Sequence, residues 1–269
     1  MYEVALATGT VTLRSEGHSA DELWGLATHP SAPELALTAG DDGSVRMWDL
    51  RTHRAARRVV LEGMARTISW SPDGTVVAVG LGGRIGGRNT RWRTLCAATT
   101  GGGAGLSRTE MESGSDGPSS AVGRDGVFAL LRADTLESVH EARDTTRPLT
   151  AIRFSASGQT LVAGSRDGKV YVYDARGGRF AMNRVLSRHT SAVTHVDVSV
   201  DGTLVRSQST GYELLFCRTD ADGEVGSASE VRDTAWHTET LPIGWAEMGV
   251  WPSSADGTDI NAVDRSKGG

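Results

Sequence analysis

The sequence has little of several features that would place it in other classes of protein. Its 269 residues include only two cysteines, Cys96 and Cys217, far apart and without CxxC spacing, so no disulfide framework and no metal site built on cysteine is predicted. No apolar run approaches the length of a membrane-spanning helix, and the first residues lack a signal-peptide pattern. The net charge of −5 gives no basic excess for nucleic-acid binding. We therefore expect a cytoplasmic protein with neither a membrane nor a nucleic-acid partner.

Proline is scarce and glycine is plentiful, with 7 and 34 residues respectively. That balance favours many short strands joined by tight turns, and the chain is long enough for one all-β domain with a full core.

One stretch organises the rest of the chain. It begins with Gly17-His18 and ends with Trp48-Asp49, and strand-like segments lie between these pairs. This is the spacing of one WD-type propeller blade of four antiparallel strands. His18 can bond Asp42 in a tight turn, and Thr38 can accept a hydrogen bond from the indole of Trp48. The sequence predicts a buried structural network of His18, Thr38, Asp42 and Trp48.

A four-residue turn motif repeats along the chain, with Pro or Gly at the positions where a turn needs them. It begins at residues 29, 71, 155 and 199 (HPSA, SPDG, SASG and SVDG). The first and last intervals match the period of roughly 40–45 residues of WD arrays, and the middle interval is about twice as long. Residues 84–122, rich in Gly, Ser, Thr and Arg, account for the excess. We predict a disordered insertion there, with a functional segment or a retained stretch of non-coding origin as alternatives.

The predicted fold is therefore an all-β, WD40-type propeller. The other blades lack the full polar set of the first: Tyr173-Asp174, Cys217-Arg218 and Leu131-Arg132 replace Trp-Asp, and Gly211 takes the aspartate position of the last blade. We expect these blades to be held mainly by apolar packing. Their predicted ranges are 17–62, 63–143 (with the insertion), 147–187 and 188–235, and 243–266 starts a further blade.

A strand-like fragment at Glu3–Arg14 has the pattern of the tail of a preceding blade. Together with the fragment near the other end, it gives an incomplete propeller of about four to five blades. We expect both ends of such an arc to expose apolar faces and to promote association.

Two segments are more specific than the general WD pattern: DELWGLATHP (Asp21–Pro30) and GVWPSSADGTDINAV (Gly249–Val263). They resemble the echinoderm microtubule-associated protein-like family, whose WD domain carries close versions of both. AVTHVDVSVDG and TGYELLF also resemble that family's ITHLDWS and GDYELLYW segments.

The resemblance implies much of the second of two joined propellers. It also implies association with tubulin or microtubules, and some members of the family occur in cilia. The chain departs from the family in three respects: no equivalent of the first propeller or of its hydrophobic signature motif, no N-terminal coiled coil, and no final blade after Ser266. These departures bear on whether this chain binds microtubules by itself.

Nothing in the sequence predicts catalysis. The glycine-rich stretches Gly80–Gly87 and Gly101–Ser107 lack the GK[ST] spacing of a phosphate loop, and no HxH, HExxH or GxSxG pattern occurs. We expect a non-enzyme with no cofactor, no metal and no small-molecule substrate.

Propeller rims serve as platforms for protein partners. Trp24, Trp245 and Trp251 are candidate partner contacts, although each could instead pack under a neighbouring blade. Arg54, Arg57 and Arg58 form a basic cluster suited to an acidic partner such as tubulin, or a solvated outer strand. The predicted function is a cytoskeletal scaffold that binds tubulin or microtubules. The alternative is a general WD adaptor in another assembly, such as a ubiquitin ligase or a trafficking complex.

Overall fold

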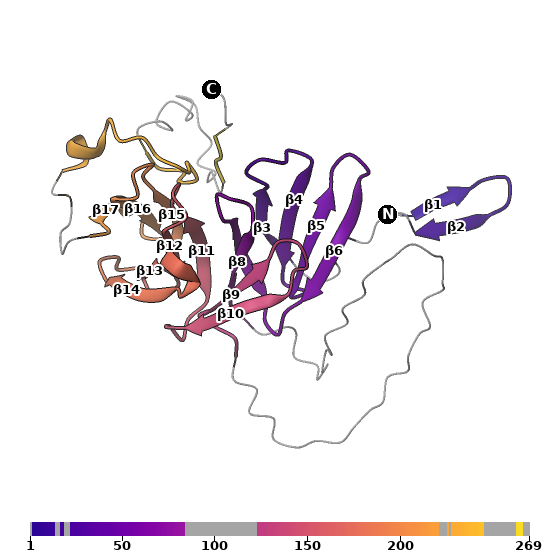
Figure 1. Ribbon diagram of the computed structural model, residues 1–269, viewed down its shortest axis with the longest axis horizontal. Helices are drawn as coiled ribbons and strands as arrows, with labels where there is room; N and C mark the ends of the chain where they lie inside the picture. The colour runs from indigo at the N-terminus through magenta and orange to yellow at the C-terminus, as the bar shows by residue number, and fades with distance from the viewer. Residues whose placement is uncertain are drawn as a thin grey trace, which may run out of the picture.

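The structure is a computed structural model that describes residues 2–13, 17–18, 22–83, 123–220, 225, 227–244 and 262–265. In these ranges the chain folds into four antiparallel sheets that follow one another in chain order, with a separate hairpin at the N-terminal side (Figure 1). Within the described ranges, helix is limited to two short 3₁₀ turns, η1 (Arg176–Gly178) and η2 (Ala228–Val231). The prediction of an all-β propeller with few blades is confirmed.

Each sheet is a meander in which neighbouring strands are also consecutive along the chain. The first sheet contains β3 (Leu23–Thr28), β4 (Leu35–Gly40), β5 (Ser44–Asp49) and β6 (Arg54–Val60). The second contains β7 (Ala65–Trp70), β8 (Val76–Leu81), β9 (Val127–Arg132) and β10 (Ser138–Arg143). The third contains β11 (Leu149–Phe154), β12 (Thr160–Ser165), β13 (Val170–Asp174) and β14 (Ala181–Leu186). The fourth has three described strands, β15 (Val193–Val198), β16 (Leu204–Ser209) and β17 (Leu214–Arg218).

The repeated turn motif joins the first two strands of each sheet. In the second sheet, Asp73 accepts hydrogen bonds from the Ser71 hydroxyl and the Thr75 amide, and Gly74 adopts φ +72°. Asp201 and Gly202 repeat this arrangement in the fourth sheet, where φ of Gly202 is +75°. A side chain at such φ values is strained, which explains the glycine that ends three of the four motifs.

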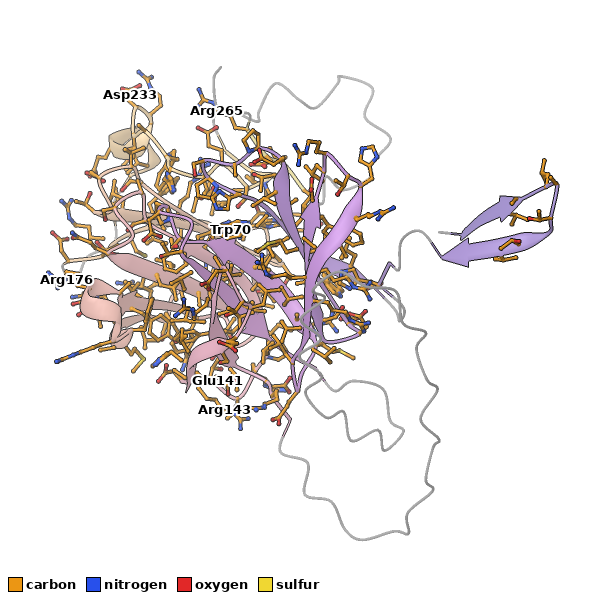
Figure 2. All side chains as sticks on the ribbon, turned by 45° about the vertical axis from the view of Figure 1, so that its right-hand side comes forward. Trp70, Glu141, Arg143, Arg176, Asp233 and Arg265 are labelled. Carbon is orange, nitrogen blue, oxygen red and sulfur yellow. The ribbon has the colours of Figure 1, made fainter. Side chains whose placement is uncertain are left out.

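Apolar layers fill the spaces between consecutive sheets. Leu37 and Met47 of the first sheet pack with Ile68 and Val79 of the second in one buried cluster. Figure 2 shows Trp70 among the sheets, and its indole N–H donates to the Ala27 carbonyl of the first sheet at 3.3 Å. The sheets are therefore joined to each other face to face, as in a propeller.

The predicted insertion, residues 84–122, lies outside the described residues. Its flanks are described: β8 pairs directly with β9, Val76 opposite Arg132 and Gly80 opposite Phe128. The Gly83 amide also donates a hydrogen bond to the Asp125 carboxylate. The chain thus leaves and re-enters one sheet between two adjacent strands.

The N-terminal residues form the expected strands, arranged as a separate two-stranded hairpin. β1 (Tyr2–Ala5) and β2 (Thr10–Leu13) pair only with each other, and the hairpin stands apart from the four sheets (Figure 1).

The C-terminal side differs from the expectation of an exposed apolar face. We use the name C-terminal strap for residues 231–243, which cover the fourth sheet. Trp236 forms a β-bridge with Ser199, at the end of β15. Val231 and Leu241 are 4% and 0% exposed. The expectation of an exposed apolar face is wrong at the C-terminal end, because the C-terminal strap folds back over the fourth sheet.

The C-terminal strap is fixed by a buried carboxylate. Asp197 is 0% exposed and forms an ion pair with Arg206, whose Nε donates at 3.0 Å. The same carboxylate accepts hydrogen bonds from the hydroxyls of Thr238 at 2.6 Å and Thr240 at 2.9 Å. The Arg206 guanidinium lies 4.7 Å from the ring centroid of Trp236. Most residues of the further blade predicted at 243–266 lie outside the described residues.

Candidate protein-interaction surface

The four residues of the predicted first-blade network lie together. His18 Nδ1 is 2.9 Å from Asp42 Oδ1, and His18 Nε2 is 2.7 Å from Thr38 Oγ1. The Trp48 indole donates to the same Thr38 oxygen at 2.7 Å. The segment before β3 is thereby tied to β4, to β5 and to the turn between them.

Two further side chains that the sequence reasoning missed complete this network. Ser44 donates its backbone N–H and its hydroxyl to Asp42 Oδ1, at 2.9 and 2.7 Å. Arg46, 1% exposed, places Nη2 3.4 Å from Asp42 Oδ2. Burial raises the pKa of Asp42, but the hydrogen bonds from His18 and Ser44 outweigh burial and lower this pKa to about 2. Asp42 is therefore an anion at neutral pH.

The third sheet has a polar network of its own beside its buried apolar cluster, built from other residue types than the first. Asp167 accepts hydrogen bonds from the hydroxyls of Thr145 at 2.8 Å and Tyr171 at 2.6 Å, and from the Lys169 amide at 3.0 Å. Thr145 takes the place of the histidine before the sheet. Burial, followed by the bond to Asp167, raises the pKa of Tyr171 to about 12.

The fourth sheet has a closer copy of the first network. His189 Nε2 lies 2.7 Å from Ser207 Oγ, and Nδ1 lies 3.1 Å from Glu213 Oε2. Glu213 also accepts from the hydroxyls of Thr190 and Ser209, at 2.6 and 2.7 Å. The carboxylate stands two residues beyond Gly211, and its longer side chain reaches back to the histidine. Position-by-position comparison therefore missed it.

The innermost strands of all four sheets share an irregularity. The pairing of each with its neighbour shifts by one residue at the strand's second position. Such a β-bulge leaves one residue out of the ladder and re-aims its side chain. The four residues at this position are Trp24, Arg66, Thr150 and Thr194.

At this bulge, the exposed Trp24 contacts the half-buried Arg66. The Arg66 guanidinium carbon lies 4.6 Å from the centroid of the Trp24 ring, a cation–π contact. Arg66 Nε lies 3.2 Å from Oδ1 of the buried Asp41 and 3.3 Å from the Gly82 carbonyl, which fixes the guanidinium. Trp24 remains 50% exposed, beside Leu23 at 55%. Trp24 thus has one side in contact with Arg66 and half of its surface exposed, and aromatic side chains of this kind are common anchors of interfaces.

The basic cluster lies on β6, the outer strand of the first sheet. Arg54, Arg57 and Arg58 are all exposed. Arg57 pairs in register with Met47, whose side chain faces the second sheet, whereas Arg58 pairs with Arg46 on the opposite face. The cluster is therefore divided between the two faces of the sheet, and it forms a positive edge rather than a flat patch.

Two of the candidate contacts, Trp245 and Trp251, lie outside the described residues, as do Gly101–Ser107 and the second half of Gly80–Gly87. Within the described ranges, no group of three or more His, Cys, Asp or Glu side chains could hold a metal ion. No helix in these ranges is long and apolar enough to cross a membrane.

The meandering sheets, the histidine–carboxylate networks and the Trp-Asp pair at the end of β5 define the chain as a WD-type β-propeller. Residues 23–269 match the family model described as the second beta-propeller of echinoderm microtubule-associated protein. The chain therefore belongs to the echinoderm microtubule-associated protein family.

Individual relatives agree with this assignment. The chain is 33% identical over 261 residues to echinoderm microtubule-associated protein-like 1 of Homo sapiens, covering 96% of this chain and 27% of the relative. It is 32% identical over 260 residues to the like-2 protein of Rattus norvegicus, covering 96% and 33%. It is 31% identical over 263 residues to the 77 kDa echinoderm microtubule-associated protein of Lytechinus variegatus, covering 97% and 33%. The chain thus spans a third or less of the length of these relatives.

Proposed function

We propose that this chain is a non-enzymatic scaffold of the cytoplasm that binds tubulin or microtubules through its propeller surface. Its membership of a microtubule-associated family carries the proposal. The packed sheets and the exposed side chains suited to protein contact support this proposal. The proposal depends on these side chains, because a fold by itself does not determine a function.

Two surfaces are the proposed contacts. Trp24, held by Arg66, supplies an aromatic anchor, and β6 supplies a positive edge for an acidic partner such as tubulin. The outer strands of the next two sheets differ from β6: β10 carries Glu141 beside Arg143, and β14 carries a single arginine. Among the three described outer strands, the group of three arginines is therefore particular to β6, in a chain whose net charge is −5.

Co-sedimentation with stabilised microtubules tests the proposal. We expect the chain to pellet with microtubules. The triple substitution Arg54→Ala, Arg57→Ala and Arg58→Ala should lower the affinity and make the remaining binding less sensitive to salt concentration. Arg143→Ala, an exposed arginine on the corresponding strand of the second sheet, is the matched control and should bind normally. Trp24→Ala tests the anchor.

Gel filtration with unpolymerised tubulin separates binding to free subunits from binding to the polymer. If the chain binds neither form, the proposal is wrong. The general WD adaptor of another assembly, such as a ubiquitin ligase or a trafficking complex, then becomes the better interpretation.

A further inference from the structure

In the second and third sheets, the turn before the outer strand contains an arginine that is neutralised by a carboxylate. Arg132 forms an ion pair with Asp134 at 2.7 Å, and Arg176 forms one with Asp174 at 2.6 Å. Each of these exposed positive charges therefore has its counterion within its own turn.

Arg54 and Arg57 of β6 differ from these arginines. Asp49 stands opposite Arg54 in the ladder, but its carboxylate accepts the backbone N–H groups of two residues in the following turn, at 2.9 and 3.2 Å. Nη1 of Arg57 approaches the sulfur of Met47 at 3.7 Å. In the part of the chain that the structure describes, no ion pair joins Arg54 or Arg57 to a carboxylate.

A β-bulge brings these two arginines onto one face of β6. The pairing of β6 with β5 passes from Arg57 to Ala55 and leaves Ala56 out of the ladder. In a regular strand, residues three apart point to opposite faces. Here the partners of Arg54 and Arg57 on β5 are two residues apart, so the two arginines share a face. Met47, the partner of Arg57, identifies it as the face toward the second sheet.

The outer strand of the second sheet offers these arginines no free carboxylate. β10 carries one acidic residue, Glu141. Glu141 is in register with Ala129 of the cluster shared with the first sheet, so it points toward that sheet. Arg124 already binds Glu141, with Nη1 at 3.0 Å from the carboxylate.

The spacing of the two arginines fits an extended polypeptide. Residues that are two positions apart along a strand are separated by about 7 Å. Alternate residues of an extended segment have the same separation and point to one side. Two carboxylates at alternate positions of such a segment can therefore each meet one guanidinium, whose planar N–H groups match a carboxylate.

We propose that Arg54 and Arg57 bind an extended acidic segment of a protein partner, with one carboxylate at each arginine. This inference rests on the proposed function and specifies what the positive edge of β6 recognises. An acidic protein segment fits better than a nucleic acid, because the two arginines lie on a single strand of a chain whose net charge is −5.

A rearrangement that keeps the net charge tests this pairing in the whole chain. Arg54→Ala combined with Ala55→Arg moves one guanidinium to the opposite face of β6 and leaves the composition unchanged. The probe is a fluorescently labelled peptide of alternating Glu and Ser, and its affinity is measured by fluorescence anisotropy. We expect the parent chain to bind the probe, and the rearranged chain to bind it about fivefold more weakly, the size of one exposed ion pair. Circular dichroism and the melting temperature should be the same for both chains.

Equal binding of the probe by the two chains, or no binding by the parent chain, would overturn the proposal. The arginines would then act only as edge charges that keep sheets from pairing with each other. Tighter binding of double-stranded DNA than of the peptide would assign the two arginines to phosphate groups and also contradict it.

Microtubule co-sedimentation separates this inference from the proposed function. A chain that pellets with microtubules but binds the probe equally well in both forms would refute only the pairing of Arg54 with Arg57. A chain that distinguishes the two forms with the probe but does not pellet would support that pairing and count against microtubules as the partner.

Discussion

Glu213 lies 3.1 Å from His189 in the fourth sheet, in the same relation that Asp42 has to His18 in the first, at 2.9 Å. The two carboxylates reach their histidines from different positions in the repeat. The geometry of the network is therefore kept while the sequence motif is lost.

The first prediction concerns Asp42→Ala. This substitution removes the carboxylate that lies beside His18 Nδ1, accepts hydrogen bonds from Ser44 and faces the buried Arg46. We expect a loss of roughly 1–3 kcal/mol in the free energy of unfolding, measured by urea denaturation. Asp167→Ala is the comparison, and it should cost less because its partners are neutral hydroxyls and an amide. Equal losses would contradict this ranking.

The pH dependence of stability follows from the same carboxylate. The pKa of Asp42 is about 2 in the folded chain, below the value of about 3.9 for an unperturbed aspartate. The contribution of the ionised Asp42 to the free energy of unfolding is therefore complete above about pH 4 and is lost as the pH falls toward 2. In Asp42→Asn we expect a smaller loss of stability between pH 6 and pH 3. The exposed Asp233→Asn serves as control, and an identical pH profile for the parent chain and Asp42→Asn would contradict the assignment.

Asp197→Ala tests the C-terminal strap. The substitution removes the acceptor of Thr238 and Thr240 and leaves the buried Arg206 unpaired. Breaking a buried pair in this way costs about 3–5 kcal/mol. We expect that loss in urea denaturation, with a red shift in the fluorescence of Trp236. The control is Arg265→Ala, which removes a surface pair with Glu239 and should cost no more than about 1 kcal/mol.

Deleting residues 84–122 should leave the fold intact. The deletion joins Gly83 to Gly123, and the hydrogen bond from Gly83 to Asp125 shows that these ends already lie close together. Shortening the connection changes the closure entropy by only about 0.6 kcal/mol for each halving of its length. Circular dichroism and the melting temperature should therefore stay close to those of the parent chain. Insoluble or unfolded protein after the deletion would show that the segment packs into the domain.

Much of the fold can be predicted from the sequence because the repeat is local. The turn motifs fix where strands begin, and the distance from His18 to Trp48 fixes the first network within one blade. The polar networks of the third and fourth sheets could not be predicted, because other residue types at other positions make the same contacts. Glu213 reaches His189 with a longer side chain than aspartate, and Thr145 stands where the first sheet has a histidine. The C-terminal strap has no strand periodicity, so nothing local indicates that Trp236 would cover β15.

The direct pairing of β8 with β9 makes the second sheet a natural place to divide the polypeptide. A chain split between residues 83 and 123 would give two pieces, each with half of that sheet and one side of its ladder. Neither half could bury its apolar faces alone, so the pieces would reassemble by fragment complementation. The scaffold could then be used as a two-part reporter, with each part fused to a different protein.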